Sequence, residues 1–345
     1  MLKQIWYRLF KIFISIGLFF FFKKIKVYNE ENIPAKGAIL LVSNHKNALI
    51  DPLLIATTTR RSIHFLTRAS AFKLKPVYWF LSTLNMIPIY RLRDGKETLA
   101  KNKAIFNKCY DILNKKKCLL IFPEGTHNIK RWVKQLSKGF TRITFGALEQ
   151  NNNLKLYLVP VGLNYTNATS FAESVSIYYG KPILANDFYN EEKLNDSTQK
   201  LKNEVHKKLI ELTTHIDVEN YDETIDKLGN VDYLNPKKIN NLINELDENK
   251  SHIPFKNQKP SMFWKTLKGI VIINSLIPLL IFKAFVPKIK ETEFISTTKF
   301  AIGLTAFPLF YTLQSLVINH FFELKYAAIY LLLSIFSVLI LAKTK

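Results

Sequence analysis

The sequence predicts an α/β fold, with a mostly parallel sheet covered by helices on both faces, an N-terminal membrane-associated helix and C-terminal transmembrane helices. Three observations predict this class. Short apolar runs alternate with helical stretches between residues 27 and 215, a long apolar stretch opens the chain, and three further apolar runs occupy its end. Strands that alternate with helices favour parallel pairing, because each crossover helix covers a face of the sheet.

The first segment, residues 1–26, is predicted to be a membrane-associated helix. Its uninterrupted apolar run from Ile12 to Phe22 is short for a membrane span, which needs about 20 residues. Trp6 and Tyr7 have basic neighbours and suit the lipid headgroup layer. No small-residue cleavage site follows, so a removed signal peptide is not expected. We therefore expect a helix that lies in, or dips into, one leaflet.

Residues 27–215 are predicted to form the α/β domain. Within it, the stretch 95–116 has apolar residues at helical spacing and lysines elsewhere. Both cysteines of the chain, Cys109 and Cys118, fall in apolar patterns without metal-ligand spacing, so we interpret them as reduced core residues. The predicted strands of this domain are 38–43, 62–67, 118–122, 156–165 and 175–180.

The remainder divides into a polar part and an apolar part. Residues 216–264 are predicted to be a polar helical segment and linker, and residues 265–345 a membrane region of about three apolar helices. The runs 269–285, 300–317 and 326–342 are each near the length that crosses a bilayer. A buried soluble bundle is the alternative, but a soluble helix shows a polar face and the last run shows almost none.

The sequence leaves the topology of this end open. Lys283 interrupts the first run, so either its ammonium group extends to the membrane surface or the run lies at the interface. If all three runs span, the C-terminus emerges opposite the α/β domain, and Lys343 and Lys345 then oppose the positive-inside tendency. A re-entrant or interfacial run would remove this conflict.

The chain is strongly basic, with 49 lysines and arginines, 27 acidic residues and a formal net charge of +22. A negatively charged membrane face, an anionic substrate and nucleic acid are all compatible with this sign. Base composition explains part of the excess, since lysine and asparagine are abundant while glycine is scarce. Nucleic acid is not expected as a partner, because no recognisable binding module is present and the terminal runs are apolar.

A histidine and an aspartate follow the first predicted strand of the domain. The run AILLVS ends just before Asn44 and His45, and Asp51 follows six residues after the histidine. This position is the carboxyl end of a strand, where open α/β sheets bind ligands. A carboxylate bonded to an imidazole fixes its tautomer and stabilises its cation, so the ring can take a proton from a hydroxyl. The alternative is structural, since Asp51-Pro52 also fits a capped helix start.

Two strand-to-turn junctions are candidate anion sites. The strand that ends at Tyr90 delivers Arg91 to a turn, and a guanidinium group can bind phosphate with two parallel bonds, although a solvated basic turn is the alternative. In FPEGT, Gly125 permits close backbone approach, and free N–H groups with the Thr126 hydroxyl can hold a phosphate. Glu124 can bond a substrate hydroxyl or a basic residue.

Two further features are weaker signals. Arg131, Lys134, Lys138 and Arg142 precede an apolar helix and are candidate anion contacts, with a solvated basic face as the alternative. Pro160 lies inside a predicted strand, which indicates an edge or a bulge and a possible role in shaping an apolar wall.

Four blocks occur in a fixed order along the chain: NHKNALID, IPIYR, FPEGT and VPVGLN. Their order resembles the PlsC-like glycerolipid acyltransferase family, which includes glycerol-3-phosphate and 1-acyl-glycerol-3-phosphate acyltransferases. The resemblance covers residues 27–215, and FPEGT after an Asn-His…Asp block at this distance is its specific part. It implies that the α/β domain is an acyltransferase domain.

The resemblance also implies roles for the residues. His45 would be the general base and Asp51 would orient it, so that an acceptor hydroxyl attacks an acyl thioester of coenzyme A or acyl carrier protein. Neither a metal nor another cofactor is needed for this chemistry. The substrate-binding candidates are Arg91, Glu124, Gly125, Thr126, Arg131 and Lys138, with Pro160 on the acyl-chain side.

The chain departs from the family pattern at two places. Five residues separate His45 from Asp51, one more than is usual, and glycerol-3-phosphate acyltransferases of the yeast type look similar in this respect. His127 stands where many members carry arginine after Pro-Glu-Gly-Thr. This removes one phosphate contact unless Arg131 or Lys138 replaces it.

We therefore expect a membrane-bound acyltransferase that makes phospholipid precursors, in a bacterial inner membrane with the catalytic domain facing the cytoplasm. The expected partners are membrane lipids, the acyl-CoA or acyl carrier protein donor, and a phosphorylated glycerol acceptor. The alternative is a non-catalytic or remodelling lipid-binding protein with the same fold, motivated by the altered spacing and by His127. Tight lipid binding without acyl transfer to any acceptor would distinguish it.

Overall fold

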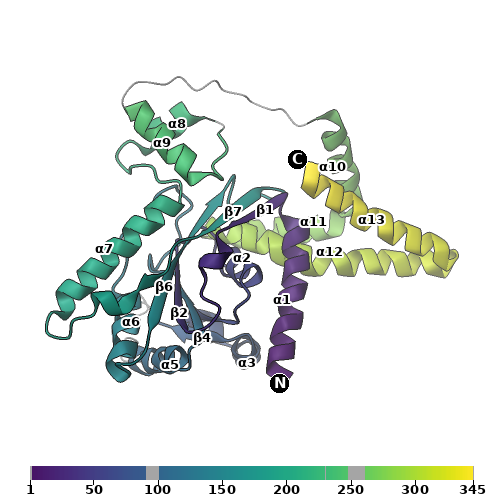
Figure 1. The fold of residues 1–345 in the computed structure, drawn as a ribbon. Helices are drawn as coiled ribbons and strands as arrows, with labels where there is room; N and C mark the ends of the chain where they lie inside the picture. Colours follow the sequence, from purple (N-terminus) through teal and green to yellow (C-terminus); the bar gives the residue numbers. More distant parts are fainter. Residues whose placement is uncertain (1, 91–100, 230, 248–260, 345) are drawn as a thin grey trace.

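The computed structural model describes residues 2–90, 101–229, 231–247 and 261–344, and its centre is one sheet (Figure 1). The strand order is β1-β7-β6-β2-β5-β3-β4, with β8 paired to β6. β6 runs antiparallel to β7 and β8 and the other pairs are parallel, which confirms the mostly parallel sheet. The strands are β1 (Lys24–Tyr28), β2 (Ala38–Ser43), β3 (Ile63–Arg68), β4 (Met86–Ile89), β5 (Cys118–Ile121), β6 (Leu156–Tyr165), β7 (Ser174–Tyr179) and β8 (Ile183–Leu184).

Helices cover both faces of this sheet, as expected. Within β2, Ala38 and Leu40 belong to the core under α5, α6 and α7, while Ile39 and Leu41 belong to the core under α1 and α2, because successive strand residues point to opposite faces. The helices of the sheet domain are α1 (Leu2–Phe21), α2 (Ile50–Thr58), α3 (Lys75–Thr83), α5 (Asn102–Asn114), α6 (Gly139–Gln150) and α7 (Leu194–Leu212), with short turns η1 (Glu30–Asn32), η2 (Ala69–Phe72) and η4 (Ala185–Phe188).

An edge strand, β1, lies where the sequence pattern did not predict one. It pairs in parallel with β7, so the sheet already includes residues assigned above to the N-terminal membrane segment. Lys24 and Lys26 alternate with Ile25 and Val27, which is the pattern of a half-buried strand. The apolar run of α1 directly before it obscures that alternation.

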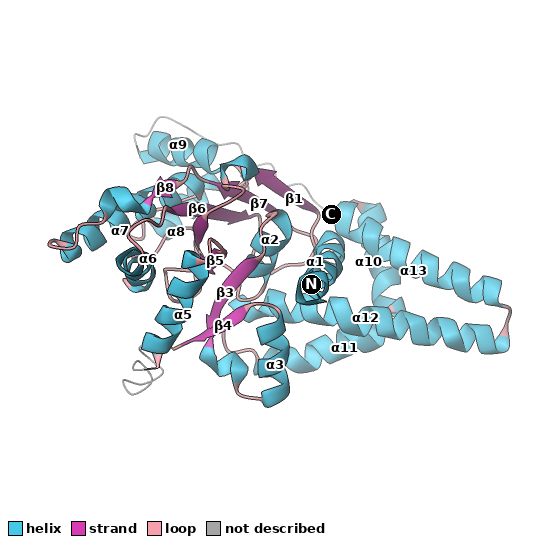
Figure 2. Cartoon of the chain, turned by 60° about the horizontal axis from the view of Figure 1, so that its bottom comes forward, coloured by secondary structure: helices cyan, strands magenta, loops and turns pink. Residues whose placement is uncertain are grey.

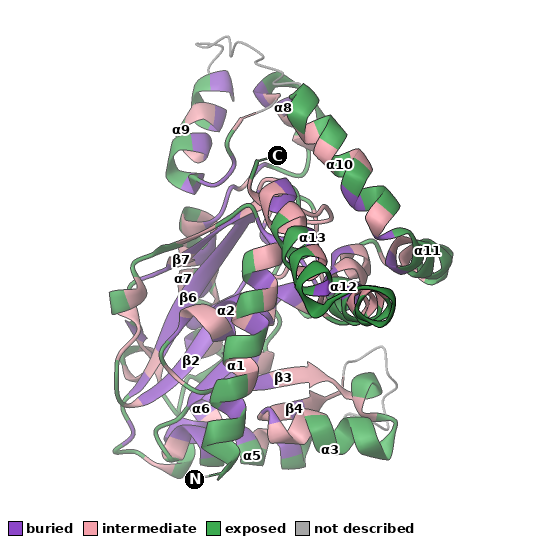
Figure 3. Ribbon diagram, turned by 90° about the vertical axis from the view of Figure 1, so that its right-hand side faces the viewer, coloured by how far each residue is buried: buried purple, intermediate pink, exposed green. Residues whose placement is uncertain are grey.

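α1 is 20 residues long and is apolar enough to cross a membrane. One side of the helix packs on the sheet domain through Tyr7, Ile14, Leu18 and Phe21. Figures 1 and 3 show that α1 runs across the base of the hairpin formed by α12 and α13, and not alongside it. If the hairpin spans a bilayer, this arrangement agrees with a helix that lies along one leaflet.

The C-terminal region consists of a broken helix pair and a helical hairpin. α10 and α11 meet at Ser275 with a bend of 85°, so the expected first span is not one straight helix. Pro278 stands in the first turn of α11, where a proline cannot donate to the preceding turn, so the helix restarts. The elements are α10 (Met262–Asn274), α11 (Leu276–Phe285), η5 (Val286–Lys288), α12 (Glu293–Phe321) and α13 (Leu324–Thr344).

The hairpin of α12 and α13 projects from the sheet domain (Figure 2), and both helices are long and apolar enough to cross a membrane. Its end returns to the domain, since Lys343 Nζ donates to the carbonyls of Phe19 and Phe22, at 2.7 and 2.8 Å. Two crossings would therefore keep the C-terminal lysines on the side of the sheet domain. The conflict with the positive-inside tendency that three spans create then disappears.

The described part of the polar segment up to residue 247 includes the helices α8 (Tyr221–Leu228) and α9 (Pro236–Asp247). They enclose a small separate core that includes Ile216, Leu228 and Ile239. Cys109 and Cys118 are buried and unpaired in the main cores, which confirms their interpretation as core residues.

Candidate active site

His45 and Asp51 lie where β2 passes into α2, at the carboxyl end of a central strand. The His45 Nδ1 atom is 2.8 Å from the Asp51 Oδ2 atom. Because a carboxylate only accepts, Nδ1 carries the proton and Nε2 keeps its lone pair. The Asp51 side chain is fully buried and the His45 side chain is 11% exposed, so the imidazole is the accessible member of the pair.

Asp51 holds the whole turn that precedes it. Its Oδ2 atom accepts from the backbone N–H groups of Lys46 and Asn47, both at 2.7 Å, and its Oδ1 atom accepts from the Tyr165 hydroxyl. Four donors compensate a carboxylate for the loss of water. The carboxylate makes no bond to an N–H group of its own helix, whose N-cap is Leu49. The simple capping interpretation of Asp51 therefore does not describe it.

Two aromatic side chains fix the plane of the His45 ring. Phe122 stacks on it at 3.8 Å between ring centroids with an interplanar angle of 14°, and His127 lies edge-on at 4.3 Å. Phe122 follows β5 and His127 follows the turn of FPEGT. The structure therefore brings the histidine block and the FPEGT block together, although more than 70 residues separate them in the sequence.

Glu124 is a buried carboxyl group in the turn after β5. Glu124 is 8% exposed. Neither of its carboxyl oxygens has a hydrogen-bond partner of good geometry among the described residues. Burial raises the pKa of Glu124 to about 7, against the opposing charge of Lys46. Gly125 beside it has φ +69°, a conformation that favours glycine. An unbonded buried acid at this position is a group prepared for a ligand.

The raised pKa of Glu124 should make the stability of the protein depend on pH. The pKa of this carboxyl group is 4.5 ordinarily and about 7 in the fold, so the stability that it contributes is full below the lower value and is lost as pH rises through the higher one. We therefore expect the melting temperature of the wild type, measured relative to that of a Glu124→Gln variant, to decrease as the pH is raised from 4.5 to about 7. Differential scanning measurements in detergent across this range check it, and a constant difference would contradict it.

Lys46 is a buried residue of the site that the sequence analysis missed. Its ammonium group donates to the carbonyl of Lys130 at 2.5 Å, and burial lowers its pKa to about 8, against the opposing charge of Glu124. It therefore ties the histidine loop to the segment after FPEGT. No signal distinguishes it in the sequence, because lysines are abundant along the whole chain.

Two other predicted anion contacts differ in their surroundings: Thr126 is bonded to a neighbouring lysine, whereas Lys138 is exposed to solvent. The Thr126 hydroxyl accepts from Lys134 Nζ at 3.1 Å, and the same ammonium group donates to the His127 carbonyl at 2.9 Å. Lys134 thus stabilises the FPEGT turn through these two hydrogen bonds. Lys138 is exposed and stands at the N-cap of α6.

The guanidinium group of Arg131 is engaged in contacts within the protein. Its two terminal nitrogens donate to the carbonyls of Tyr165 and Thr166, at 2.9 and 3.0 Å, and its guanidinium group lies 3.5 Å from the centre of the Tyr233 ring. These contacts attach the end of β6 to the α8–α9 segment, so the guanidinium group is engaged away from a substrate phosphate. Arg91 lies outside the described residues.

Pro160 lies in an interior strand, which corrects the expectation of an edge, while the pairing beside it is interrupted, as the alternative of a bulge expects. β6 has β2 on one side and β7 with β8 on the other. The Pro160 carbonyl accepts from Gly180, so its nitrogen also faces that second side. There the pairing to β8 ends at Leu158 and the pairing to β7 begins at Val161. The missing N–H therefore falls in a gap of the ladder and costs no bond.

The first turns of α12 reach the site from the C-terminal region. The Thr297 hydroxyl accepts from the backbone N–H of Leu49 at 3.2 Å and donates to the Asn47 side-chain oxygen at 3.4 Å. Phe294 lies edge-on to His127 at 5.6 Å between ring centroids, and Glu291 is 3.9 Å from the ring nitrogen of His127. The start of a candidate membrane helix thus holds the loop that carries His45.

Replacing Thr297 should therefore weaken the site without unfolding the helix. One hydrogen bond contributes about 0.5–1.5 kcal/mol, so we expect Thr297→Val to lower the turnover of the purified protein by about 2- to 12-fold. Thr297→Ser keeps the hydroxyl and should restore it. The control is Thr305→Val, because the Thr305 hydroxyl bonds only within its own helix, to Ala301. Equal losses in the Thr297→Val and Thr305→Val variants would contradict the assignment.

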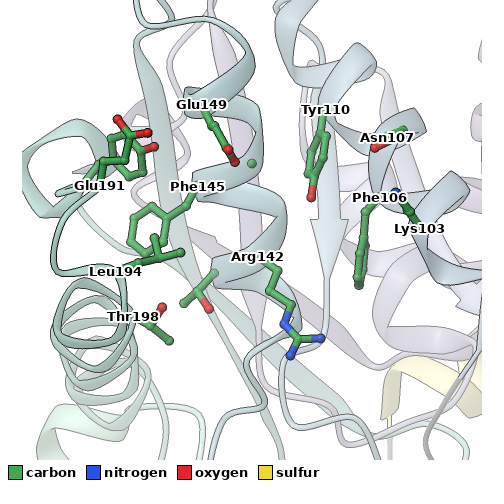
Figure 4. A pocket seen from close by; sticks show the side chains of 13 residues that line it. Lys103, Phe106, Asn107, Tyr110, Arg142, Phe145, Glu149, Glu191, Leu194 and Thr198 are labelled. Carbon is green, nitrogen blue, oxygen red and sulfur yellow. The ribbon is translucent and has the colours of Figure 1, made fainter. Parts of the chain in front are cut away.

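Two cavities accompany this arrangement. A hollow of about 260 Å³ lies between the His45 loop and the end of β6, lined by Lys46, Arg131 and Tyr165 among others. A larger hollow of about 470 Å³ lies between α5, α6 and the start of α7, with Tyr110 and Arg142 in its lining (Figure 4). None of the residues of the His45 site lines the larger hollow, so size alone does not identify the reactive site.

Comparison with known proteins finds similarity to acyltransferases. A family model described as Acyltransferase matches residues 24–164. The chain is 21% identical to glycerol-3-phosphate O-acyltransferase 2 of Saccharomyces cerevisiae, over 53% of this chain and 38% of that protein. It is 28% identical to a probable 1-acyl-sn-glycerol-3-phosphate acyltransferase of Mycoplasma pneumoniae, over 40% of this chain and 51% of that protein.

Among solved structures, the chain is similar to the 1-acyl-sn-glycerophosphate acyltransferase PlsC of Thermotoga maritima. The TM-score is 0.44 at 20% sequence identity, over 59% of this chain and 80% of that one. The yeast and Mycoplasma relatives named above are matched by this chain over about half of their own length or less.

Proposed function

Residues 24–164 form a domain of the acyltransferase family, and from this premise we propose that the protein is a membrane-bound glycerolipid O-acyltransferase of phospholipid synthesis. The observation that carries the proposal is the 2.8 Å contact between His45 and Asp51 next to the unbonded carboxyl group of Glu124. A base, its orienting acid and a free polar group at one strand end are the parts that acyl transfer to a hydroxyl needs.

In the proposed reaction, His45 Nε2 takes the proton of the acceptor hydroxyl as the hydroxyl oxygen bonds to the carbonyl carbon of the acyl thioester. The tetrahedral intermediate then collapses, the C–S bond breaks, and the imidazolium returns the proton to the departing thiolate. Asp51 keeps Nδ1 protonated and stabilises the imidazolium throughout. The donor is a thioester of coenzyme A or acyl carrier protein, and the residues need no further cofactor.

The acceptor is glycerol-3-phosphate or 1-acyl-glycerol-3-phosphate in this proposal. Glu124 bonds an acceptor hydroxyl, while the Thr126 hydroxyl donates to the phosphate. Gly125, whose N–H donates to the Phe122 carbonyl at 3.2 Å, keeps the turn tight beside them. Lys138, exposed at the start of α6, contributes positive charge. Because Arg131 is engaged with backbone carbonyls, it supports the site and does not bind the phosphate.

The membrane location of the site is part of the proposal. α1, α12 and α13 are long and apolar enough to cross a bilayer, and the first turns of α12 contact the His45 loop. A site attached to a membrane helix in this way stays at the depth where acyl chains and lipid headgroups meet. We assign the sheet domain to the cytoplasmic side, because acyl thioesters are cytoplasmic, and the lysines at the end of α13 then obey the positive-inside tendency.

Expression in a bacterial host that lacks either the first or the second acylation step of phospholipid synthesis tests this function. Lipid mass spectrometry should show that the wild-type protein restores the missing lipid in one of the two hosts, and this host identifies the acceptor. The His45→Ala variant should restore neither. A protein that is present in the membrane and binds lipid, yet restores neither host, would support the non-catalytic lipid-binding alternative.

A further inference from the structure

The outer surface of α3 is apolar and uncovered. The helix has no buried residue, although its sequence KPVYWFLST is largely apolar. Trp79 is 69% exposed and Leu74, directly before the helix, is 67% exposed, while Tyr78, Val77 and Phe80 are also exposed. A run of large apolar side chains that faces outward on one short helix marks a contact surface.

This surface continues directly into α1. The Trp6 indole N–H donates to the Thr83 hydroxyl at 3.0 Å, and the rings of Phe10 and Phe80 meet edge to face at 5.8 Å. The side of α1 that faces away from the sheet is itself exposed and apolar, through Leu2, Ile5, Leu9, Ile12, Phe13, Ile16 and Phe19.

α3 and α1 also have a defined position relative to the hairpin of α12 and α13. Figure 3 looks along the projecting hairpin toward the sheet domain, and in this view α1 crosses in front of the sheet, while α3 lies beside β4 at the edge of the sheet. A bilayer that contained the hairpin would therefore meet α1 at its surface, and with it α3, which contacts α1.

The charges around α3 fit the surface of a bilayer better than its interior. Lys73 and Lys75 are exposed at the start of the helix, and Lys3 and Arg8 are exposed on the neighbouring end of α1. Basic side chains beside tryptophan and tyrosine are typical of the headgroup layer, where anionic lipids attract them. A nine-residue helix is about 14 Å long and is too short to cross a membrane.

We infer that α3 is a second interfacial helix, which lies beside α1 in the headgroup layer of a membrane that contains anionic lipid. The docking of α3 rests on exposure, ring contacts and charge, and not on the proposed reaction. One consequence does rest on that reaction: β4 follows α3 and runs parallel to β3, so its carboxyl end lies at the same edge of the sheet as the end of β2 that precedes His45. α3 would then hold this side of the site at the depth of a lipid phosphate.

Cysteine labelling of the full chain in lipid nanodiscs tests the inference. Both native cysteines are buried, so an introduced cysteine reports alone, and labelling of the native pair signals unfolding. The test variant is Leu74→Cys, and the control is Val218→Cys, which is 57% exposed before α8. With a water-soluble maleimide and phosphatidylglycerol-containing discs, we expect the test variant to label at least about 10-fold more slowly than the control, because the headgroup layer covers it. Equal rates would overturn the inference.

A second measurement separates the bilayer from a protein partner. In a variant with Trp6→Phe, Trp132→Phe and Trp264→Phe, Trp79 is the single tryptophan left. Lipids brominated near the top of the acyl chain should quench its fluorescence in nanodiscs. Slow labelling of the Leu74→Cys variant without quenching of Trp79 would contradict the inference and indicate a second copy or another protein on this surface. Neither readout requires acyl transfer, so a failed function and a failed docking are distinguishable.

Discussion

Replacing His45 by alanine should lower the turnover of the purified protein by about 10²–10⁴-fold, the contribution of a positioned general base. The physical reason is local. Nε2 is the nitrogen left available when Asp51 holds Nδ1, and Phe122 holds the ring plane, so the His45 ring is positioned to take the proton. Steady-state rates with an acyl thioester and a labelled acceptor measure the loss.

The matched control for this variant is His206→Ala. His206 lies on α7, on the far face of the sheet, and its removal should leave turnover unchanged. The His206→Ala variant should retain the wild-type melting temperature within a few degrees, whereas the His45→Ala variant should melt lower, because the buried Asp51 carboxylate loses one of its four donors. Turnover near the wild-type value in the folded His45→Ala variant would remove His45 from the catalytic role.

Replacing Asp51 by asparagine should cost about 10²-fold or more in turnover, because an amide in this place no longer fixes the imidazole tautomer or stabilises its cation. The change keeps the size of the side chain but introduces a donor where four donors already converge. A fall in stability is expected as well, since one buried N–H group loses its acceptor. The control is Asp111→Asn, an exposed position on α5.

The double variant separates an orienting acid from an independent one. If Asp51 acts through His45, the His45→Ala and Asp51→Asn changes together should be little worse than His45→Ala alone, because residues that act as a unit are not additive. A loss equal to the product of the two single losses would contradict the orienting role. Measuring all three variants under one set of conditions makes the comparison independent of the assay.

Most of the sheet domain could be predicted because its residues obey local rules. The continuous apolar run of β2, which is buried on both faces, and the helical spacing of Ile105, Cys109 and Leu113 in α5 are local signals of this fold. The contact between His45 and Asp51 could also be anticipated, because only five residues lie between them. What the sequence predicted less well are contacts that cross the chain, and β1, whose short alternation follows an apolar helix directly.

Tyr165 and Thr297 show why the remaining parts of the site escaped prediction. They lie 114 residues from Asp51 and 250 residues from Asn47, respectively, and each contributes only a hydroxyl that is ordinary in sequence. Arg131 shows the opposite error. Its charge suggested a phosphate contact, but burial places its guanidinium group against two carbonyls and a tyrosine ring. Composition identifies the charge and only the fold identifies its partner.

The break between α10 and α11 has a similar explanation. By composition the run that contains Lys283 is as apolar as a span, and only the bend at Ser275 shows that it is two helices. Membrane topology therefore depends on a geometric feature that hydropathy does not encode. Lys343 then joins α13 to the end of α1, which a hydropathy plot also does not indicate.

The most direct test of the account is acyl transfer by the purified protein in nanodiscs. Acyl-CoA and acyl carrier protein donors with a radiolabelled chain are offered with glycerol-3-phosphate or 1-acyl-glycerol-3-phosphate, and the labelled lipid is measured. We predict a new acyl ester on at least one of these acceptors, formed by the wild type and lost in the His45→Ala variant. No labelled ester from a folded wild-type protein with any donor and acceptor, or equal ester from the His45→Ala variant, would contradict the account.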